Sequence, residues 1–201
     1  NSSGTLIGSE TNVGTARYGV AGAGLGTTGV FYAGYNAATN RVTRINASGA
    51  LIGSETNVGT ARAYLAGVGL SGTTGVFYAG ASPTIYNRVT RINASGVLIG
   101  SETNVGTARA DLAGAGLGTT GVFYNGIVTR INASGVLIGS ETNVGTARNG
   151  VAGAGLGTTG VFYAGYNAAT NRVTRINASG ALIGSETNVG TARGYLAGAA
   201  L

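Results

Sequence analysis

Residues 46–62 read NASGALIGSETNVGTAR, and this phrase returns along the chain with few changes. Further copies begin at Asn93, Asn132 and Asn177, and a variant, NSSGTLIGSETNVGTAR, begins at Asn1. The spacings between successive starts are 45, 47, 39 and 45 residues. A recurring period of about 40 to 50 residues is typical of tandem-repeat folds. We therefore expect one array over residues 1–201, with units starting near 1, 46, 93, 132 and 177 and the last unit partial.

Each unit is expected to contain four short β-strands. In the first full unit these are residues 20–25, 30–32, 41–45 and 50–53, and a polar connection, 54–62, leads into the next unit. Val, Ile, Thr, Phe and Tyr favour strands, whereas Gly-Thr-Thr-Gly and Asn-Ala-Ser-Gly favour turns.

The third copy shows how two of these strands are related. Its loop between the second and third strands shrinks to Asn125-Gly126, between Tyr124 and Ile127. Asn-Gly between two apolar runs predicts a β-hairpin with a type I′ turn. The second and third strands should therefore be antiparallel neighbours.

The repeat predicts an all-β protein, a β-propeller of four-stranded antiparallel blades. The alternative is a β-solenoid or repeat fibre. A change from 45 to 39 residues is easier to absorb in the loop of a blade than in a solenoid rung.

Residues 16–53 resemble a kelch-type blade. They have an arginine before the inner strand, an aromatic second strand ending in small residues, a third strand, and a turn into the outer strand. The family's paired glycines correspond to Ala33-Gly34, and Leu51 and Ile52 stand near the place of its outer-strand tryptophan. The segment INASGALIG also resembles the turn of quinoprotein-type propellers. The resemblance covers nearly the whole chain and implies a propeller.

Composition limits the class of protein and its partners. Hydrophobic residues make up 43% of the chain and charged residues 9%, so there is apolar surface to bury and disorder is not expected. The net charge of +6 comes from arginines spread over every unit rather than clustered, so we expect no nucleic-acid partner. No run of about 18 apolar residues occurs, so we expect no membrane span.

Catalytic groups are scarce. The chain has no histidine and no cysteine, so the usual triads and the usual zinc and copper sites cannot be built. The oxidase activity carried by some kelch-type propellers needs such ligands and does not transfer. The repeated glutamates lie one per unit, whereas glycosidases need two converging carboxylates. We expect no enzyme activity, no metal and no cofactor.

A glutamate and an arginine recur seven residues apart in every unit. We expect this Glu/Arg ring to be structural, with salt bridges or backbone hydrogen bonds that fix each connection between units. The alternative is a polar ring at the mouth of a channel. The arginine pairs of the third strands, such as Arg41 and Arg44, are expected on a solvated strand edge. The members of the ring are Glu10, Arg17, Glu55, Arg62, Glu102, Arg109, Glu141, Arg148, Glu186 and Arg193.

Differences between the copies concentrate in two places: the two residues after the repeated arginine, and the loop between the second and third strands. In a blade whose strands alternate in direction, both places emerge on one face. Tyr, Asn, Gly, Ser and Asp dominate there, as they do in adaptable recognition surfaces. The predicted ligand-binding residues are Tyr18, Tyr64, Asp111, Asn149, Tyr195, Tyr35, Tyr86 and Tyr166.

These features favour a non-catalytic repeat scaffold, a structural or recognition module of a microbial or viral surface appendage, fibre or adhesin. It would be extracellular or on a virion or cell surface, with a protein or glycan ligand. The alternatives are a carbohydrate-binding propeller lectin and an engineered scaffold without natural function. Because the chain begins without methionine and its end units are partial, we expect a processed or longer array, or self-association that covers the open ends.

Overall fold

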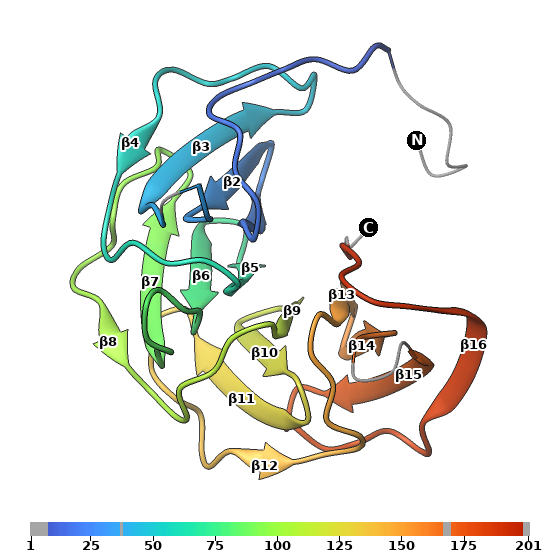
Figure 1. Cartoon of the computed structure of the whole chain (residues 1–201). Helices are drawn as coiled ribbons and strands as arrows, with labels where there is room; N and C mark the ends of the chain where they lie inside the picture. Colours follow the sequence, from blue (N-terminus) through green and yellow to red (C-terminus); the bar gives the residue numbers. More distant parts are fainter. Residues whose placement is uncertain (1–7, 37, 167–169, 199–201) are drawn as a thin grey trace.

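The computed structural model describes residues 8–36, 38–166 and 170–198, and within these ranges the protein contains β-strands and no α-helix. The described residues form sixteen strands in four separate antiparallel sheets of four strands each (Figure 1). The expected all-β class and the four-stranded antiparallel units are thereby confirmed. In the described ranges, no helix is long and apolar enough to cross a membrane.

The strands of each sheet are hydrogen-bonded in chain order. The first sheet contains β1 (Ala21–Leu25), β2 (Thr28–Tyr32), β3 (Arg41–Asn46) and β4 (Thr56–Asn57). The second contains β5 (Ala66–Leu70), β6 (Thr74–Tyr78), β7 (Arg88–Asn93) and β8 (Thr103–Asn104). The third contains β9 (Ala113–Leu117), β10 (Thr120–Tyr124), β11 (Ile127–Asn132) and β12 (Thr142–Asn143). The fourth contains β13 (Ala152–Leu156), β14 (Thr159–Tyr163), β15 (Thr170–Asn177) and β16 (Thr187–Arg193).

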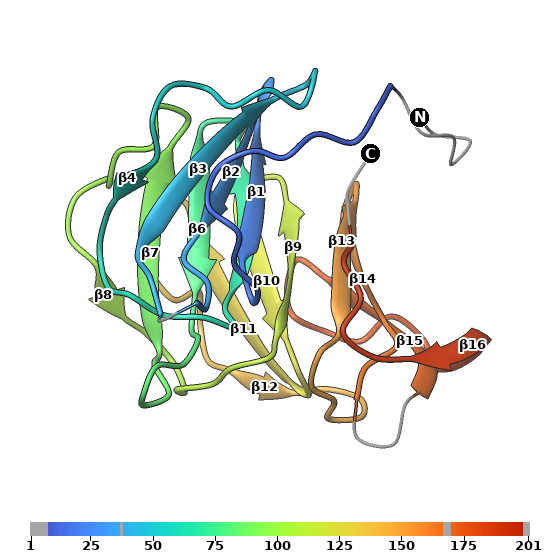
Figure 2. The ribbon, with the colours of Figure 1, turned by 45° about the horizontal axis from the view of Figure 1, so that its top comes forward.

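The sheets follow one another around a common axis, with the first strand of each sheet innermost and the fourth at the periphery (Figure 1). β1 lies against β5, β5 against β9, and β9 against β13. In Figures 1 and 2 the first and fourth sheets lie apart, as the two ends of the series. This arrangement is the one expected of a propeller.

The apolar core lies between neighbouring sheets rather than within one sheet. Val30 and Tyr32 of β2 pack with Phe77 of β6 and Ile92 of β7, and all four side chains are fully buried. Equivalent clusters fill the interfaces between the second and third sheets and between the third and fourth. Stacking of the sheets therefore buries surfaces that one sheet alone would expose.

Glycine allows the inner strands to approach closely. A Cβ atom added at Gly69 of β5 would lie less than 3.0 Å from the carbonyl oxygen of Gly24 on β1. Gly116 of β9 and Gly155 of β13 meet the preceding strand in the same way. Side chains at these positions would force the inner strands apart, so the small residues of each first strand bring the sheets together.

The expected outer strand is misplaced in the sequence-based assignment. Residues 50–53 were expected to form it, but Leu51 makes only an isolated bridge to Ile45. Gly49 and Gly53 both have a positive φ, so the chain turns on either side of this short segment. The fourth strand is instead β4, which pairs with the start of β3. The same shift occurs in all four sheets.

The third-copy hairpin is confirmed, but its turn is not type I′. β10 and β11 pair antiparallel, with Tyr124 opposite Val128. Gly126 has a φ of +108°, whereas Asn125 does not have a positive φ. A type I′ turn requires positive φ at both central residues. The pairing Tyr124–Val128 encloses Asn125, Gly126 and Ile127, which explains why two-residue turn geometry does not apply.

Candidate recognition surface

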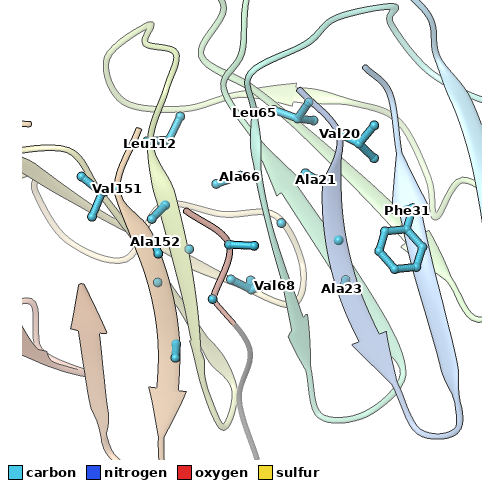
Figure 3. Close-up of a pocket in the computed structure, with 18 of the residues that line it drawn as sticks. Val20, Ala21, Ala23, Phe31, Leu65, Ala66, Val68, Leu112, Val151 and Ala152 are labelled. Atoms are coloured by element: carbon cyan, nitrogen blue, oxygen red, sulfur yellow. The ribbon is translucent and has the colours of Figure 1, made fainter. Parts of the chain in front are cut away.

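A central cavity of about 980 Å³ is lined by the inner strands of the four sheets and by Leu196–Gly198 near the C-terminus. Figure 3 shows that small apolar side chains supply much of this lining, including Ala21, Ala23, Ala66 and Ala152. Tyr18, Tyr64, Asp111 and Tyr195 also line the cavity. This cavity, which we call the channel, is therefore lined by small apolar residues along the inner strands and by polar and aromatic side chains that precede these strands.

Five residues, one from each unit, connect the units through main-chain hydrogen bonds beside this channel. We call them the mouth ring: Gly19, Tyr64, Asp111, Gly150 and Tyr195. Each backbone N–H from Tyr64 onward donates to the carbonyl oxygen of the preceding member, and all four N···O distances are 2.9 Å. All five have a φ between +56° and +65°.

Main-chain hydrogen bonds hold the mouth ring, and its side chains differ from member to member. Glycine, tyrosine and aspartate occupy the same left-handed conformation at equivalent places. Left-handed φ is costly for residues other than glycine, asparagine and aspartate. Tyr64 and Tyr195 adopt it nevertheless, and their rings lie at the surface, 38% and 67% exposed.

The two variable places of the repeat are cross-strand partners. Tyr18 exchanges backbone hydrogen bonds with Tyr35, at N···O distances of 3.1 and 2.7 Å, and Asn149 pairs in the same way with Tyr166. In the third unit Asn125 donates its side-chain N–H to the carbonyl oxygen of Ala110, at 3.3 Å. The variable residues after the repeated arginine therefore lie beside the variable residues of the loop between the second and third strands.

The structure brings most of the predicted tyrosines together in two groups. Tyr18 lies 5.2 Å from Tyr35 and 6.4 Å from Tyr64, measured between ring centroids. Tyr166 and Tyr195 stack at 5.6 Å with an interplanar angle of 30°. We call these five residues the tyrosine face. All five are exposed, by 38% to 67%.

The remaining predicted residues behave differently. Asn149 is exposed beside Tyr166, and Asp111 is half-buried at the channel, where burial raises the pKa of its carboxyl group. Tyr86 does not join the tyrosine face. Its hydroxyl donates to the carbonyl oxygen of Ser82 at 2.9 Å, and the Arg88 guanidinium lies 5.7 Å over its ring. Tyr86 thus packs on its own loop.

The arginines of the Glu/Arg ring are mostly buried and bind glutamates and main-chain groups; they do not form a channel mouth. We call each such arginine with its hydrogen-bond partners a lock. Arg62 is fully buried, and its guanidinium donates to the carbonyl oxygens of Ala79 and Phe77, to the Thr90 hydroxyl and to Glu102. The same guanidinium lies 5.4 Å over the ring of Tyr32 in the preceding sheet. Each lock therefore ties the start of one sheet to the end of that sheet and to its neighbour.

The pairing within the ring runs between units, not within the seven-residue spacing. Arg17 pairs with Glu55 at 3.2 Å, Arg62 with Glu102 at 3.2 Å, and Arg109 with Glu141 at 3.4 Å. Arg148 donates to the Thr174 hydroxyl, which itself donates to Glu186. The first glutamate, Glu10, and the last arginine, Arg193, are exposed. Arg193 lies 6.0 Å over the ring of Tyr163.

Hydrogen bonds hold these glutamates ionised. Burial alone would raise the pKa of Glu55, but donors from Thr43, Thr15 and Arg41 together lower it to about 2. The pKa of Glu186 is likewise lowered to about 2 against the effect of burial, chiefly by Thr174 and Thr146. The four glutamates from Glu55 to Glu186 therefore act as fixed charges of the framework.

Sequence reasoning missed several members of the locks. The third-strand threonines Thr43, Thr90, Thr129 and Thr174 each bridge an arginine and a glutamate. The first arginine of the third strand was expected on a solvated edge, yet Arg41 pairs with Glu55 at 3.0 Å. The recurrence of Val-Thr-Arg in every third strand was a signal that could have indicated this role.

Comparison of the chain with protein-family models and with curated protein sequences gives no match. The resemblance to kelch-type and quinoprotein-type blades therefore stays a prediction.

Proposed function

We propose that the four sheets are blades of a β-propeller and that the chain is a non-catalytic recognition module, which binds its ligand through the tyrosine face. One observation carries this proposal. Five exposed tyrosines occupy variable positions of an otherwise nearly constant repeat, and they form two groups, with neighbouring rings within each group. Exposed aromatic clusters at one site mark interaction surfaces.

The framework supports variation at these positions without loss of the fold. Gly19 and Gly150 have the same conformation and the same backbone hydrogen bonds as Tyr64 and Tyr195. A tyrosine at these positions makes the same main-chain hydrogen bonds as a glycine. Its side chain adds contact surface and a hydroxyl group for a ligand. Tyrosine is also a rigid, amphipathic residue that gives up little side-chain entropy on binding.

A glycan is the ligand class that these groups suit best. A sugar ring presents apolar C–H groups on its faces and hydroxyl groups around its rim. The stacked rings of Tyr166 and Tyr195 offer an aromatic surface, and the exposed Asn149 amide lies on the strand segment paired with Tyr166. A glycan-binding module of a microbial or viral surface is the setting that we propose.

A protein ligand is the second candidate, because tyrosine is enriched at the energetic centres of protein interfaces. The exposed pair Tyr18 and Tyr35 beside Tyr64 favours it, since three clustered rings resemble such a centre. The two ligand classes differ in what they require of Asn149. A glycan would use its amide, whereas an aromatic protein contact centred on Tyr18 would not.

A glycan array tests the proposal with two matched variants. The tyrosine-stripped variant carries Tyr18→Ala, Tyr64→Gly, Tyr166→Ala and Tyr195→Gly, and both glycines enter positions where the repeat already accepts glycine. The control carries Val97→Ala and Val136→Ala, which are 55% exposed and lie in the turns after the third strands. We expect binding by the wild type and the control and its loss in the stripped variant. Failure of the wild type to bind any glycan would overturn the glycan assignment.

A further inference from the structure

Each interface between neighbouring sheets contains a tyrosine inserted into a socket of the following sheet. Tyr32 of β2 is fully buried and packs edge-on against Phe77 of β6, with ring centroids 5.2 Å apart. Its hydroxyl donates to the carbonyl oxygens of Val58 and Thr60, at 3.1 and 2.9 Å. Tyr78 and Tyr124 fill the next two sockets, against Phe123 and Phe162 respectively.

The first sheet has the same socket, but no tyrosine of the described residues fills it. A cavity of about 280 Å³ is lined there by Val13, Arg17, Val20, Phe31, Thr43 and Ile45. In the second sheet the corresponding residues are Val58, Arg62, Leu65, Phe77, Thr90 and Ile92. The lining of the filled and unfilled sockets is therefore nearly identical in chemistry.

Exposure of the socket floor shows the difference directly. Phe31 is 37% exposed, whereas its three equivalents, Phe77, Phe123 and Phe162, are fully buried. On the inner strand of the same sheet, an added Cβ at Gly24 would meet no atom within 4 Å. The exposed face of the first sheet thus has the shape and the apolar residues needed to pack against another sheet.

A segment near the C-terminus, Leu196–Gly198, lies against the inner strand of the fourth sheet. Near the C-terminus, Tyr195 donates its backbone N–H to the carbonyl oxygen of Gly150, and Gly198 closely contacts Gly153 of β13. These are the contacts that each inner strand makes with the preceding one. Leu196–Gly198 therefore lies where the inner strand of a further sheet would lie.

We propose that the open socket of the first sheet receives the tyrosine of a second-and-third-strand hairpin from another copy of this repeat, supplied in trans. The tyrosine ring would pack on Phe31 under the Arg17 guanidinium, and its hydroxyl would donate to the carbonyl oxygens of Val13 and Thr15. The second strand of the hairpin would pair with Leu196–Gly198. The three filled sockets of the chain identify this chemistry, and the assignment does not depend on the tyrosine face.

A peptide of residues 117–132, LGTTGVFYNGIVTRIN, tests the proposal because it is the repeat hairpin with the shortest loop. The labelled peptide is titrated with the full chain and followed by fluorescence anisotropy. We expect saturable one-to-one binding, weakened at least about ten-fold by Tyr124→Ala in the peptide. Tyr124→Phe, which removes only the hydroxyl, should fall between the two.

Two variants of the chain block the socket in different ways. Phe31→Ala removes its floor, and Ala16→Trp places a large ring at its exposed rim, where Ala16 lines the cavity. Either variant that keeps the wild-type circular dichroism spectrum should bind the peptide at least about ten-fold more weakly. No saturable binding at concentrations on the order of 1 mM would overturn the proposal. Equal binding of the Tyr124→Ala peptide, or of a folded socket variant, would overturn it as well.

Discussion

The close approach of the inner strands gives a sharp test of the architecture, through two substitutions at the same place in the repeat. Gly69→Ala puts a Cβ atom less than 3.0 Å from the backbone oxygen of Gly24. A carbonyl oxygen held in a sheet cannot rotate away as a side chain could, so β5 must move from β1. Gly24→Ala is the matched control, because nothing lies within 4 Å of the added atom.

The magnitudes follow from packing energetics. Overpacking a tight interface costs about 1–3 kcal/mol, so Gly69→Ala should lower the free energy of unfolding by about 2 kcal/mol. With a urea m-value of about 2 kcal/mol/M, the unfolding midpoint should fall by about 1 M. Gly24→Ala restricts the unfolded chain without a clash, so its midpoint should stay the same or rise by up to about 0.5 M.

Urea unfolding followed by far-ultraviolet circular dichroism measures both midpoints under one set of conditions. A Gly24→Ala midpoint as low as that of Gly69→Ala would mean that β1 has an inner neighbour like that of β5. Equal, small effects of both substitutions would mean that the inner strands do not approach closely. The first result would contradict the open inner face of β1, and the second would contradict the close approach of β5 to β1.

Three further predictions concern charged groups. Arg62→Met leaves Glu102 without its buried partner and should lower the free energy of unfolding by about 3–5 kcal/mol. The control Arg175→Met, at an exposed arginine, should change it by no more than about 0.5 kcal/mol. Urea midpoints compare the two variants, and equal effects would argue against the buried lock. Because the pKa values of Glu55 and Glu186 are lowered to about 2, their stabilising contribution should be complete above about pH 4.3 and disappear as the pH falls towards 2. The double variant Glu55→Gln, Glu186→Gln should therefore be less stable than the wild type at pH 7 and approach it at pH 2, and a pH-independent difference would contradict this. Because burial raises the pKa of Asp111, its ionised form opposes folding, so Asp111→Asn should raise the urea midpoint more at pH 7 than at pH 3; a gain that is the same at both values would contradict the assignment.

The inner three strands of each sheet could be predicted from the sequence because their residues follow strand chemistry. Residues 41–45 were expected and β3 is Arg41–Asn46, so the error is one residue. The outer strand could not be predicted in the same way. The apolar side chains of Leu51 and Ile52 led to the prediction of a strand at residues 50–53. The strand is instead formed by Thr56 and Asn57, which are exposed and pair with β3 through main-chain groups. Composition carries no sign of such a strand.

The candidate surface was found by comparison of copies within the chain. Two of the residues that it singled out, Tyr18 and Tyr35, are cross-strand partners with neighbouring rings, and their role in ligand binding stays a prediction. The glutamate partner of each arginine could not be predicted, because the spacing along the chain does not show which glutamate lies beside the arginine in the folded protein. Arg62 meets Glu102, 40 residues later, and not Glu55, seven residues earlier.

The partial end units predicted open ends of the array, but the sequence could not identify the unfilled socket at one of them. Phe31 and Phe77 stand in identical sequence surroundings, GVFYAG, and differ only in what lies opposite them in space. Exposure of 37% against 0% appears only once the sheets are placed.

Nuclear magnetic resonance of the tyrosine rings shows whether a bound glycan contacts the tyrosine face. The chain, labelled with ¹³C in its tyrosine side chains, is titrated with the glycan that binds most strongly on the array. We predict shifts of Tyr18, Tyr35, Tyr64, Tyr166 or Tyr195 and none of the buried Tyr32, Tyr78 and Tyr124. Saturable binding that leaves all five exposed rings unshifted would contradict the assignment of the tyrosine face as the recognition surface.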